Sequence, residues 1–174
     1  MTCRAVFLDR DGVINKAIIR NGNAFSPRTK AEFSFIDGVL EAIARLKDAG
    51  FKVIVVTNQP DISRKKMDPQ DLAWMTGQIL KQLPVDEIII CPHDDKDCCN
   101  CRKPKAGMLL DSARKWDIDL KHSYMIGDSW KDMDAGKTAG CTCILIDAPY
   151  NQDVHCLTRA RYLADAVRMI SGHK

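Results

Sequence analysis

Five short apolar runs recur along the chain, and they constrain its fold more than any other feature. None is longer than five residues, and each is continuous rather than alternating between apolar and polar positions. This pattern is typical of strands that are covered on both faces in a parallel sheet. The expected strands are Ala5–Leu8, Lys52–Val56, Glu87–Ile90, Tyr124–Ile126 and Thr142–Ile146.

Amphipathic segments between these runs predict helices. The expected helices span residues 38–49, 68–83, 106–116, 131–139 and 157–170. Alternating strands and helices of this length imply right-handed crossovers. We therefore expect an α/β fold, a three-layer sandwich with a central, Rossmann-like parallel sheet, in a single domain over residues 1–174. The stretch from Asn15 to Ser34 is long and irregular, so it is a candidate flap over a site.

Charge and hydropathy exclude some classes of partner. The net charge of +3 comes from 26 basic and 23 acidic residues scattered along the chain, without the basic stripe that nucleic-acid binding favours. The longest apolar runs fall far short of a membrane span, and no charged segment leads into an apolar signal region. We expect a cytoplasmic monomer that acts on a small anionic substrate and binds neither nucleic acid nor membranes.

Asp9 and Asp11 directly follow the first run and carry the strongest chemical signal. Two carboxylates one residue apart at the end of a buried strand raise each other's pKa, so their pairing indicates metal or phosphate chemistry. Alternation along the strand sends both side chains to one face, and Gly12 lets the backbone turn away. One can serve as a covalent nucleophile and the other as a proton donor and acceptor. Two solvated aspartates in a turn are the alternative reading of this pair alone.

Further polar residues follow the later strands, and the carboxyl ends of parallel strands meet at one ligand-binding edge. Thr57 and Asn58 offer donors suited to phosphate oxygens. Lys103 offers a positive charge, and Asp128 offers a hard oxygen for magnesium. Singly, these residues could be a polar turn, a solvated lysine or a helix N-terminus. Together they supply the parts that phosphoryl transfer needs.

A cluster of cysteines with one histidine precedes Lys103. The segments Cys91-Pro92-His93 and Cys99-Asn100-Cys101 present three thiolates and one imidazole, a ligand set for tetrahedral zinc. Cys98 is a rival for Cys99 as the third ligand, and Cys99 is preferred because it makes a symmetrical pair. Four protein ligands leave no open position, so we expect a structural zinc that fixes the place from which Lys103 projects.

The chain resembles the haloacid dehalogenase superfamily of phosphatases. The four superfamily motifs match, in order, Asp9-Arg10-Asp11-Gly12, Thr57-Asn58, Lys103 and Gly127-Asp128-Ser129-Trp130-Lys131-Asp132. The resemblance implies that Asp9 attacks phosphorus and that Asp11 protonates the leaving alkoxide and later activates water. It implies that Thr57 and Lys103 hold the phosphoryl group. It also implies magnesium on Asp9, the backbone carbonyl of Asp11 and Asp128, with Asp132 supporting the waters of the metal.

Within the superfamily, the cysteine loop directly before Arg102-Lys103-Pro104 resembles that of the D-glycero-D-manno-heptose 1,7-bisphosphate 7-phosphatases and the related histidinol phosphatases. This resemblance implies a capless fold with a zinc-binding loop, and a phosphorylated sugar as substrate, cleaved at the C7 phosphate on the route to surface carbohydrates. Histidinol phosphate is the alternative substrate. A catalytically idle, zinc-stapled interaction module is a third reading. The zinc loop looks shorter than in many heptose phosphatases, and Pro60-Asp61 stands where a Ser-Gly turn is common.

In a capless site, discrimination must come from loops that contact the rest of the substrate. The expected substrate-binding side chains are Asn58, Arg28, Arg64 and Arg102. A pocket rich in arginine favours the heptose bisphosphate, whereas added carboxylates favour histidinol phosphate.

Overall fold

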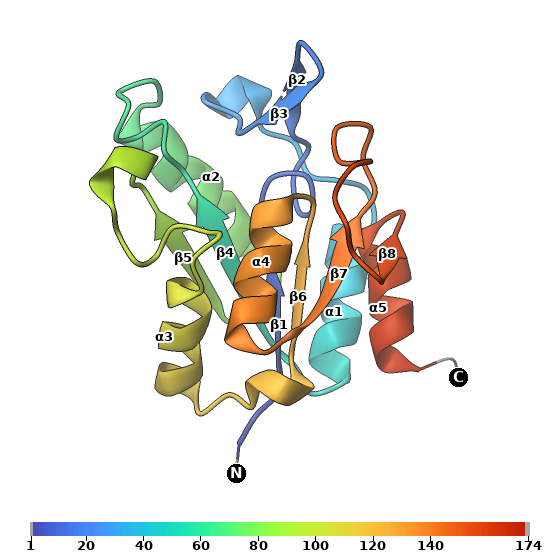
Figure 1. The fold of residues 1–174 in the computed structure, drawn as a ribbon. Coiled ribbons are helices and arrows are strands. Elements are labelled where there is room, and N and C mark those ends of the chain that lie inside the picture. The colour runs from blue at the N-terminus through green and yellow to red at the C-terminus, as the bar shows by residue number, and fades with distance from the viewer. Residues whose placement is uncertain (1, 173–174) are drawn as a thin grey trace.

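The computed structural model describes residues 2–172, and a six-stranded parallel sheet lies at their centre (Figure 1). Its strands, in spatial order, are β5 (Glu87–Cys91), β4 (Lys52–Asn58), β1 (Ala5–Leu8), β6 (Tyr124–Gly127), β7 (Thr142–Ile146) and β8 (Arg159–Ala160). All five neighbouring pairs are parallel. The five predicted strands are confirmed, and β8 is an additional one.

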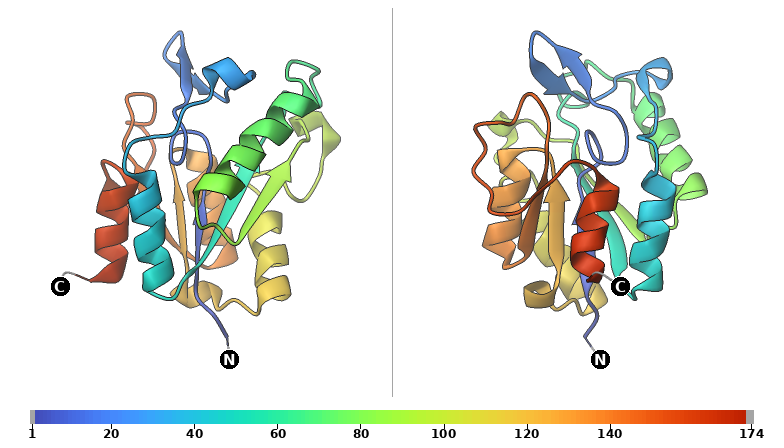
Figure 2. Two further views of the ribbon diagram at one scale, coloured as in Figure 1. Left: turned by 180° about the vertical axis from the view of Figure 1, so that it is seen from behind. Right: turned by 90° about the vertical axis from the view of Figure 1, so that its right-hand side faces the viewer.

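Helices cover both faces of the sheet, which confirms the predicted three-layer sandwich (Figures 1 and 2). One layer contains α1 (Val39–Asp48), α2 (Pro69–Gln82) and α5 (Leu163–Ser171), and the other contains α3 (Gly107–Trp116) and α4 (Trp130–Ala139). Short 3-10 helices are η1 (Lys30–Glu32), η2 (Asp95–Asp97) and η3 (Leu120–His122). Within residues 2–172, no helix is long and apolar enough to cross a membrane.

The central strand β1 shows why the apolar runs are continuous. Val6 and Leu8 pack into the core on the side of α1 and α5, whereas Ala5 and Phe7 pack into the core on the side of α3. All four side chains are fully buried. Burial of a large apolar side chain contributes roughly 1.5–3 kcal/mol, so a strand covered on both faces gains from an apolar residue at every position.

The last predicted helix was placed too far toward the N-terminus. Helix α5 begins at Leu163, and the segment before it forms β8. The Leu145 N–H donates to the Thr158 carbonyl at 3.0 Å and the Asp147 N–H donates to the Ala160 carbonyl at 2.8 Å. These backbone bonds to the edge of β7 hold the segment extended, and the side chain of Leu157 is 95% exposed rather than part of a packed helix face.

The stretch from Asn15 to Ser34 is ordered, which corrects the expectation of an irregular segment. Strands β2 (Ile18–Arg20) and β3 (Asn23–Phe25) pair antiparallel in a hairpin around Asn21 and Gly22, both with positive φ. The hairpin stands above the edge at which the central strands end, as all three views show (Figures 1 and 2). This position suits the predicted flap.

Two helical glycines provide a matched test of the packing between α4 and the sheet. A Cβ at Gly136 would lie 2.6 Å from Cys143 Sγ and 2.7 Å from Met125 Cβ, whereas a Cβ at Gly77 in α2 would meet nothing within 4 Å. Alanine raises helix propensity at both sites by up to about 1 kcal/mol. We predict that Gly77→Ala raises the free energy of unfolding, and that Gly136→Ala lowers it by about 1–3 kcal/mol through overpacking. Urea unfolding followed by circular dichroism measures both, and equal stabilisation would contradict close packing at Gly136.

Candidate active site

A cavity of about 460 Å³ opens at the carboxyl edge of the sheet, below the β2–β3 hairpin. Side chains from four strand ends line it: Asp9 after β1, Asn58 at the end of β4, Lys103 beyond β5 and Asp128 after β6. The topology therefore brings together residues that are far apart in the sequence, at the edge where parallel α/β sheets bind ligands.

Lys103 is the buried cation of the site. Its side chain is 2% exposed, and its Nζ lies 2.8 Å from Asp9 Oδ1 and 2.6 Å from Asp132 Oδ1. Nζ also donates to the Val56 carbonyl at 2.7 Å. Burial alone lowers the pKa of a lysine, but the two carboxylates outweigh burial and raise the pKa of Lys103. The lysine is therefore a fixed positive charge.

Asp9 and Asp128 lie in a site with an excess of negative charge. The pKa of Asp9 is raised to about 7, mainly by burial and further by Asp132 and Asp11, while Lys103 opposes the shift. Burial, together with Asp9 and Asp132, also raises the pKa of Asp128. Carboxylate oxygens of Asp9, Asp128 and Asp132 all lie within 4.8 Å of one another. Hard oxygen ligands at this spacing fit magnesium, whose charge would relieve the repulsion.

Gly12 leaves the space that this cluster occupies. Its φ is +85°, and a Cβ built on it would lie 1.9 Å from Asp128 Oδ2. Any other residue would therefore displace the Asp128 carboxylate as well as strain the turn. The glycine was expected for the turn, but its close approach to Asp128 was not visible in the sequence.

Asp11 is surrounded by hydrogen-bond donors. Arg10 donates to both of its carboxylate oxygens, and Asn15, Ser26 and Gln59 donate at 2.9, 2.7 and 2.8 Å. Burial raises the pKa of Asp11, but the Arg10 charge and these hydrogen bonds outweigh it and hold the pKa below its ordinary value. These contacts thus favour the ionised form of Asp11, in which the carboxylate can act as a base.

Thr57 and Asn58 occupy different environments at the end of β4. Asn58 lines the cavity, and its side chain donates to the Lys103 carbonyl at 2.9 Å while accepting from the Lys103 N–H at 3.1 Å. Asn58 therefore anchors the backbone of the lysine. Thr57 is 1% exposed and is not part of the cavity lining; its hydroxyl accepts from the Gln59 amide at 2.8 Å. Its predicted contact with phosphate stays a prediction.

Two of the three arginines expected to contact substrate line the cavity. Arg64 forms two hydrogen bonds to Asp94, and Arg102 donates to Asp95 at 2.7 Å and to the His93 carbonyl at 3.2 Å.

The structure places Arg28 outside the cavity lining. Its Nε lies 2.6 Å from Asp61, which itself lines the cavity. We infer that Arg28 orients Asp61 at the cavity wall.

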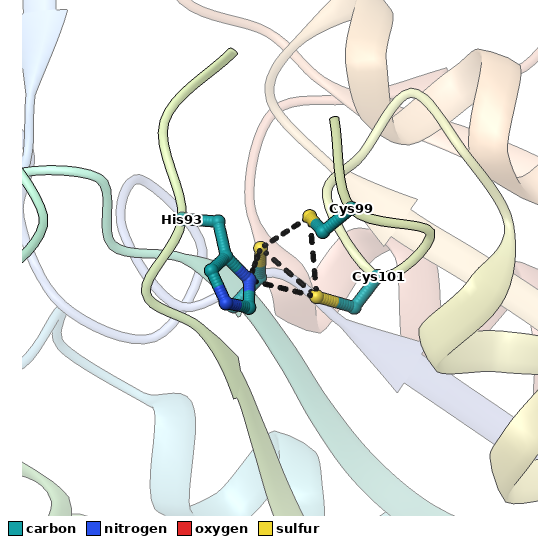
Figure 3. Close-up of side chains that lie close together, drawn as sticks. His93, Cys99 and Cys101 are labelled. Carbon is teal, nitrogen blue, oxygen red and sulfur yellow. Dashed lines mark hydrogen bonds between the residues drawn. The ribbon is translucent and has the colours of Figure 1, made fainter. Parts of the chain in front are cut away.

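The predicted zinc ligands form a compact cluster (Figure 3). Cys91 ends β5, and His93, Cys99 and Cys101 come from the loop that follows, with one ligand atom from each lying within 4.8 Å of the others. The sulfur atoms are 3.2 to 3.7 Å apart, and His93 faces them with Nδ1, 3.4 Å from Cys101. Tetrahedral zinc with Zn–S bonds of about 2.3 Å requires sulfurs about 3.7 Å apart. The donor set and its spacing fit zinc.

Cys98 lies outside this cluster. It is exposed, with positive φ, and the nearest hydrogen-bond partner of its Sγ is the Asp95 carbonyl at 3.9 Å. Between the two cysteines that the sequence left open, the geometry favours Cys99.

Sequence reasoning did not single out several residues of the cavity. Tyr150 donates to Asp128 Oδ2 at 2.5 Å, and the buried Asn151 donates to the Asp128 carbonyl at 2.7 Å. Trp130 and Lys131, which follow Asp128 in its motif, also line the cavity. The loop after β7 offered no sequence signal for a role at Asp128. The sequence did carry a signal for Trp130, because it is an aromatic residue two positions after the candidate metal ligand Asp128.

The geometry of the cysteine cluster predicts different effects for two adjacent residues. Cys99→Ser removes one of the four proposed zinc ligands. Loss of a residue that only hydrogen-bonds to a ligand weakens metal binding roughly 10- to 100-fold, so loss of the ligand itself should lower zinc affinity by more than that. It should also lower the midpoint of thermal unfolding. Cys98→Ser is the matched control and should retain about one zinc per chain. Elemental analysis of the purified variants measures this, and the reverse order of zinc contents would contradict the ligand set.

The raised pKa of Asp9 predicts how pH changes stability. Its pKa is about 7 in the folded protein, against an ordinary value of 3.8 for an aspartate. The stability that this group contributes is therefore fully present below about pH 4 and is lost as pH rises through about 7. In magnesium-free buffer without chelator, which leaves zinc in place, the thermal midpoint should fall from about pH 5.5 to about pH 8.

Added magnesium should raise the midpoint more at the higher pH, because it binds the ionised carboxylates. Asp9→Asn is the control, since it lacks the titrating group and should show a smaller pH effect. A magnesium-induced increase that is the same at both pH values would contradict this account.

Comparisons with known proteins agree with the fold and the motifs. A family model described as HAD-hydrolase-like matches residues 100–167. The D-glycero-beta-D-manno-heptose-1,7-bisphosphate 7-phosphatase of Photorhabdus laumondii is 41% identical over 147 residues, covering 78% of this chain and 75% of that protein. The protein of the same name from Pasteurella multocida is 38% identical and covers 98% of both chains.

A solved structure is similar throughout. The crystal structure of D,D-heptose 1,7-bisphosphate phosphatase from Bordetella bronchiseptica, in complex with magnesium and phosphate, superposes with a TM-score of 0.84 at 30% identity, covering 96% of this chain and 97% of that one. The resemblance inferred from the four motifs is thus confirmed. The chain belongs to the D-glycero-beta-D-manno-heptose-1,7-bisphosphate 7-phosphatase family of HAD-like phosphatases.

Proposed function

We propose that this protein is a magnesium-dependent phosphatase that removes the C7 phosphate of D-glycero-D-manno-heptose 1,7-bisphosphate through an aspartyl-phosphate intermediate. The observation that carries the proposal is the contact of Asp9 with Lys103 in a cavity that Asp128 and Asp132 also line. Relatives at 38–41% identity bear the name of this enzyme. A similar structure was determined with magnesium and phosphate, which supports both the metal and the reaction class.

In the first step, a carboxylate oxygen of Asp9 attacks the phosphorus. A bond from Asp9 to phosphorus forms, and the bond from phosphorus to the C7 oxygen breaks. Lys103 supplies positive charge at Asp9, and magnesium, held by Asp9 and Asp128, would supply the remaining charge that the phosphoryl oxygens need. Asn58 keeps Lys103 in place because it binds both backbone groups of the lysine.

Asp11 handles the proton in both steps. In the first step it gives a proton to the leaving C7 oxygen. In the second step it takes a proton from the water that attacks the aspartyl phosphate. This attack releases Asp9 and inorganic phosphate. The donors around Asp11 favour its ionised form, the form required in the second step. In the first step Asp11 is protonated and donates a hydrogen bond, so one of the groups that donate to it must become an acceptor. The Ser26 hydroxyl can do so by rotating, because a hydroxyl both donates and accepts.

Zinc has a structural role in this proposal. The four-ligand cluster leaves no position for substrate, and Arg102 and Lys103 follow directly after Cys101. A closed zinc site therefore fixes the start of the segment that carries the catalytic lysine. None of the eight cysteines forms a disulfide in the described structure, which suits the reducing cytoplasm that we propose as the compartment. We retain the prediction of a monomer.

The outer cavity distinguishes the heptose substrate from histidinol phosphate. Its carboxylates Asp61 and Asp95 are each paired with arginine, Asp61 with Arg28 and Asp95 with Arg102. Among the described residues, both carboxylates of the outer cavity are already paired with arginine, so neither is free to bind the amine of histidinol. The pairing therefore favours a substrate with hydroxyls and a second phosphate.

The two aspartates should respond differently to removal of their charge. Asp9→Asn should abolish turnover of every phosphate ester, because an amide cannot act as the nucleophile. Asp11→Asn should reduce the rate by about 100-fold or more on a sugar phosphate but less on an aryl phosphate, whose leaving group needs no proton. Steady-state rates and trapping of the phosphoenzyme check this. Turnover of Asp9→Asn near that of the unaltered protein would contradict the covalent mechanism.

A substrate panel tests the proposed specificity. Heptose 1,7-bisphosphate should be cleaved only at C7, with kcat/KM well above that of heptose 7-phosphate, and Arg102→Ala should narrow this difference. Arg114 on α3 is exposed and absent from the cavity lining, so Arg114→Ala provides the control variant. Faster cleavage of histidinol phosphate than of any sugar phosphate would overturn the substrate assignment while leaving the phosphatase mechanism intact.

A further inference from the structure

An exposed indole lies in the wall of the active-site cavity. Trp130 is 50% exposed, although large aromatic side chains usually bury most of their surface. Within residues 2–172, only Trp130 and Phe25 among the exposed large apolar side chains line the cavity, and Phe25 is 40% exposed. Exposed apolar surface that gathers in a cavity, rather than being scattered singly over a surface, indicates contact with a ligand.

The two aromatic residues of the cavity lining come from different elements. Trp130 is the first residue of α4, two positions beyond Asp128, and Phe25 ends β3 in the hairpin that stands above this edge of the sheet (Figure 1). A substrate whose phosphate is held at Asp9 therefore shares the cavity with both aromatic side chains.

Lys131 supplies a positive charge beside the indole. Its Nζ lies 5.8 Å from the centre of the Trp130 ring, and it lines the same cavity. The lysine forms no ion pair with the described residues, in contrast to Arg64 and Arg102, each of which is paired with an aspartate. Arg102 and Asp95 also belong to the lining of this cavity.

We propose that Trp130 is the platform on which the sugar of the substrate lies, with Phe25 above it, and that Lys131 binds the second, distal anionic group. The C–H face of a sugar is apolar and packs against an aromatic ring, while an unpaired ammonium is a good ligand for phosphate. This inference rests on the proposed function and names residues that determine its specificity. All three residues act on binding of the part of the substrate that does not react.

Kinetics on three substrates distinguish substrate binding by Trp130 and Lys131 from a purely structural role of these residues. The substrates are heptose 1,7-bisphosphate, heptose 7-phosphate and acetyl phosphate, which has no sugar. Trp130→Ala should lower kcat/KM for both heptose phosphates at least tenfold more than for acetyl phosphate, and Trp130→Phe should restore much of this loss. Lys131→Met should lower kcat/KM for the bisphosphate at least fivefold more than for heptose 7-phosphate. Lys137→Met, on the same helix but outside the cavity lining, is the matched control.

Each alternative outcome is distinct. Equal losses of Trp130→Ala on all three substrates would overturn the platform, and equal losses of Lys131→Met on both heptose phosphates would overturn the distal site. In both cases the proposed function would stand. An unaltered protein that cleaves acetyl phosphate but not heptose 1,7-bisphosphate would overturn the proposed function and, with it, this inference.

Fluorescence gives a second measurement that does not depend on turnover. The chain has three tryptophans, and only Trp130 lines the cavity, whereas Trp74 and Trp116 do not. Titration of the magnesium-loaded protein with heptose 1-phosphate, the sugar product, should change the indole emission saturably, and inorganic phosphate should change it much less. The response should be absent in Trp130→Phe. A response that persists in this variant, or no response in the unaltered protein, would overturn the platform.

Discussion

The ion pairs of Lys103 with Asp9 and Asp132 are the interaction on which the rest of the site depends. A buried ammonium is costly unless carboxylates surround it, and three carboxylates so close together, two of them buried, repel one another unless a cation is present. The fold meets both demands by holding the lysine backbone from two sides. Asn58 binds its N–H and carbonyl from the end of β4, and the cysteine cluster fixes the loop directly before it.

The single positive charge of Lys103 does not neutralise the carboxylates of Asp9, Asp128 and Asp132. The remaining negative charge connects metal binding to catalysis. Asp9 keeps a raised pKa in spite of its contact with the lysine, because burial and the neighbouring carboxylates outweigh that contact. A divalent cation at Asp9 and Asp128 would convert Asp9 to the anion that attacks phosphorus. Asp11 needs no such help, since Arg10 already stabilises its charge. Two aspartates separated by one residue thus acquire different protonation behaviour from their surroundings.

Most of the fold could be predicted from the sequence because burial on both faces leaves a clear apolar pattern. Strand β8 has two residues and no such pattern, and it forms only through backbone bonds to β7. Asp9 and Asp128 could be predicted since each follows an apolar run, and Lys103 could be predicted from the cysteine loop that directly precedes it. The contacts of Ser26 and Tyr150 could not, because they depend on how a hairpin and a distant loop fold over the strand ends. The ion pair of Arg28 with Asp61, which lines the cavity, was likewise not visible in the sequence, and the predicted contact of Arg28 with substrate stays a prediction.

The position of Cys91 has a consequence for the life of the protein in the cell. Cys91 ends β5, which is the outermost strand on its side of the sheet, and the metal-binding loop continues from that strand. An edge strand that loses its cover can pair with the same strand of another molecule. With the zinc site that we propose, loss of the metal would release the end of an apolar edge strand. The proposed metal would thus protect the protein from aggregation as well as position its catalytic lysine.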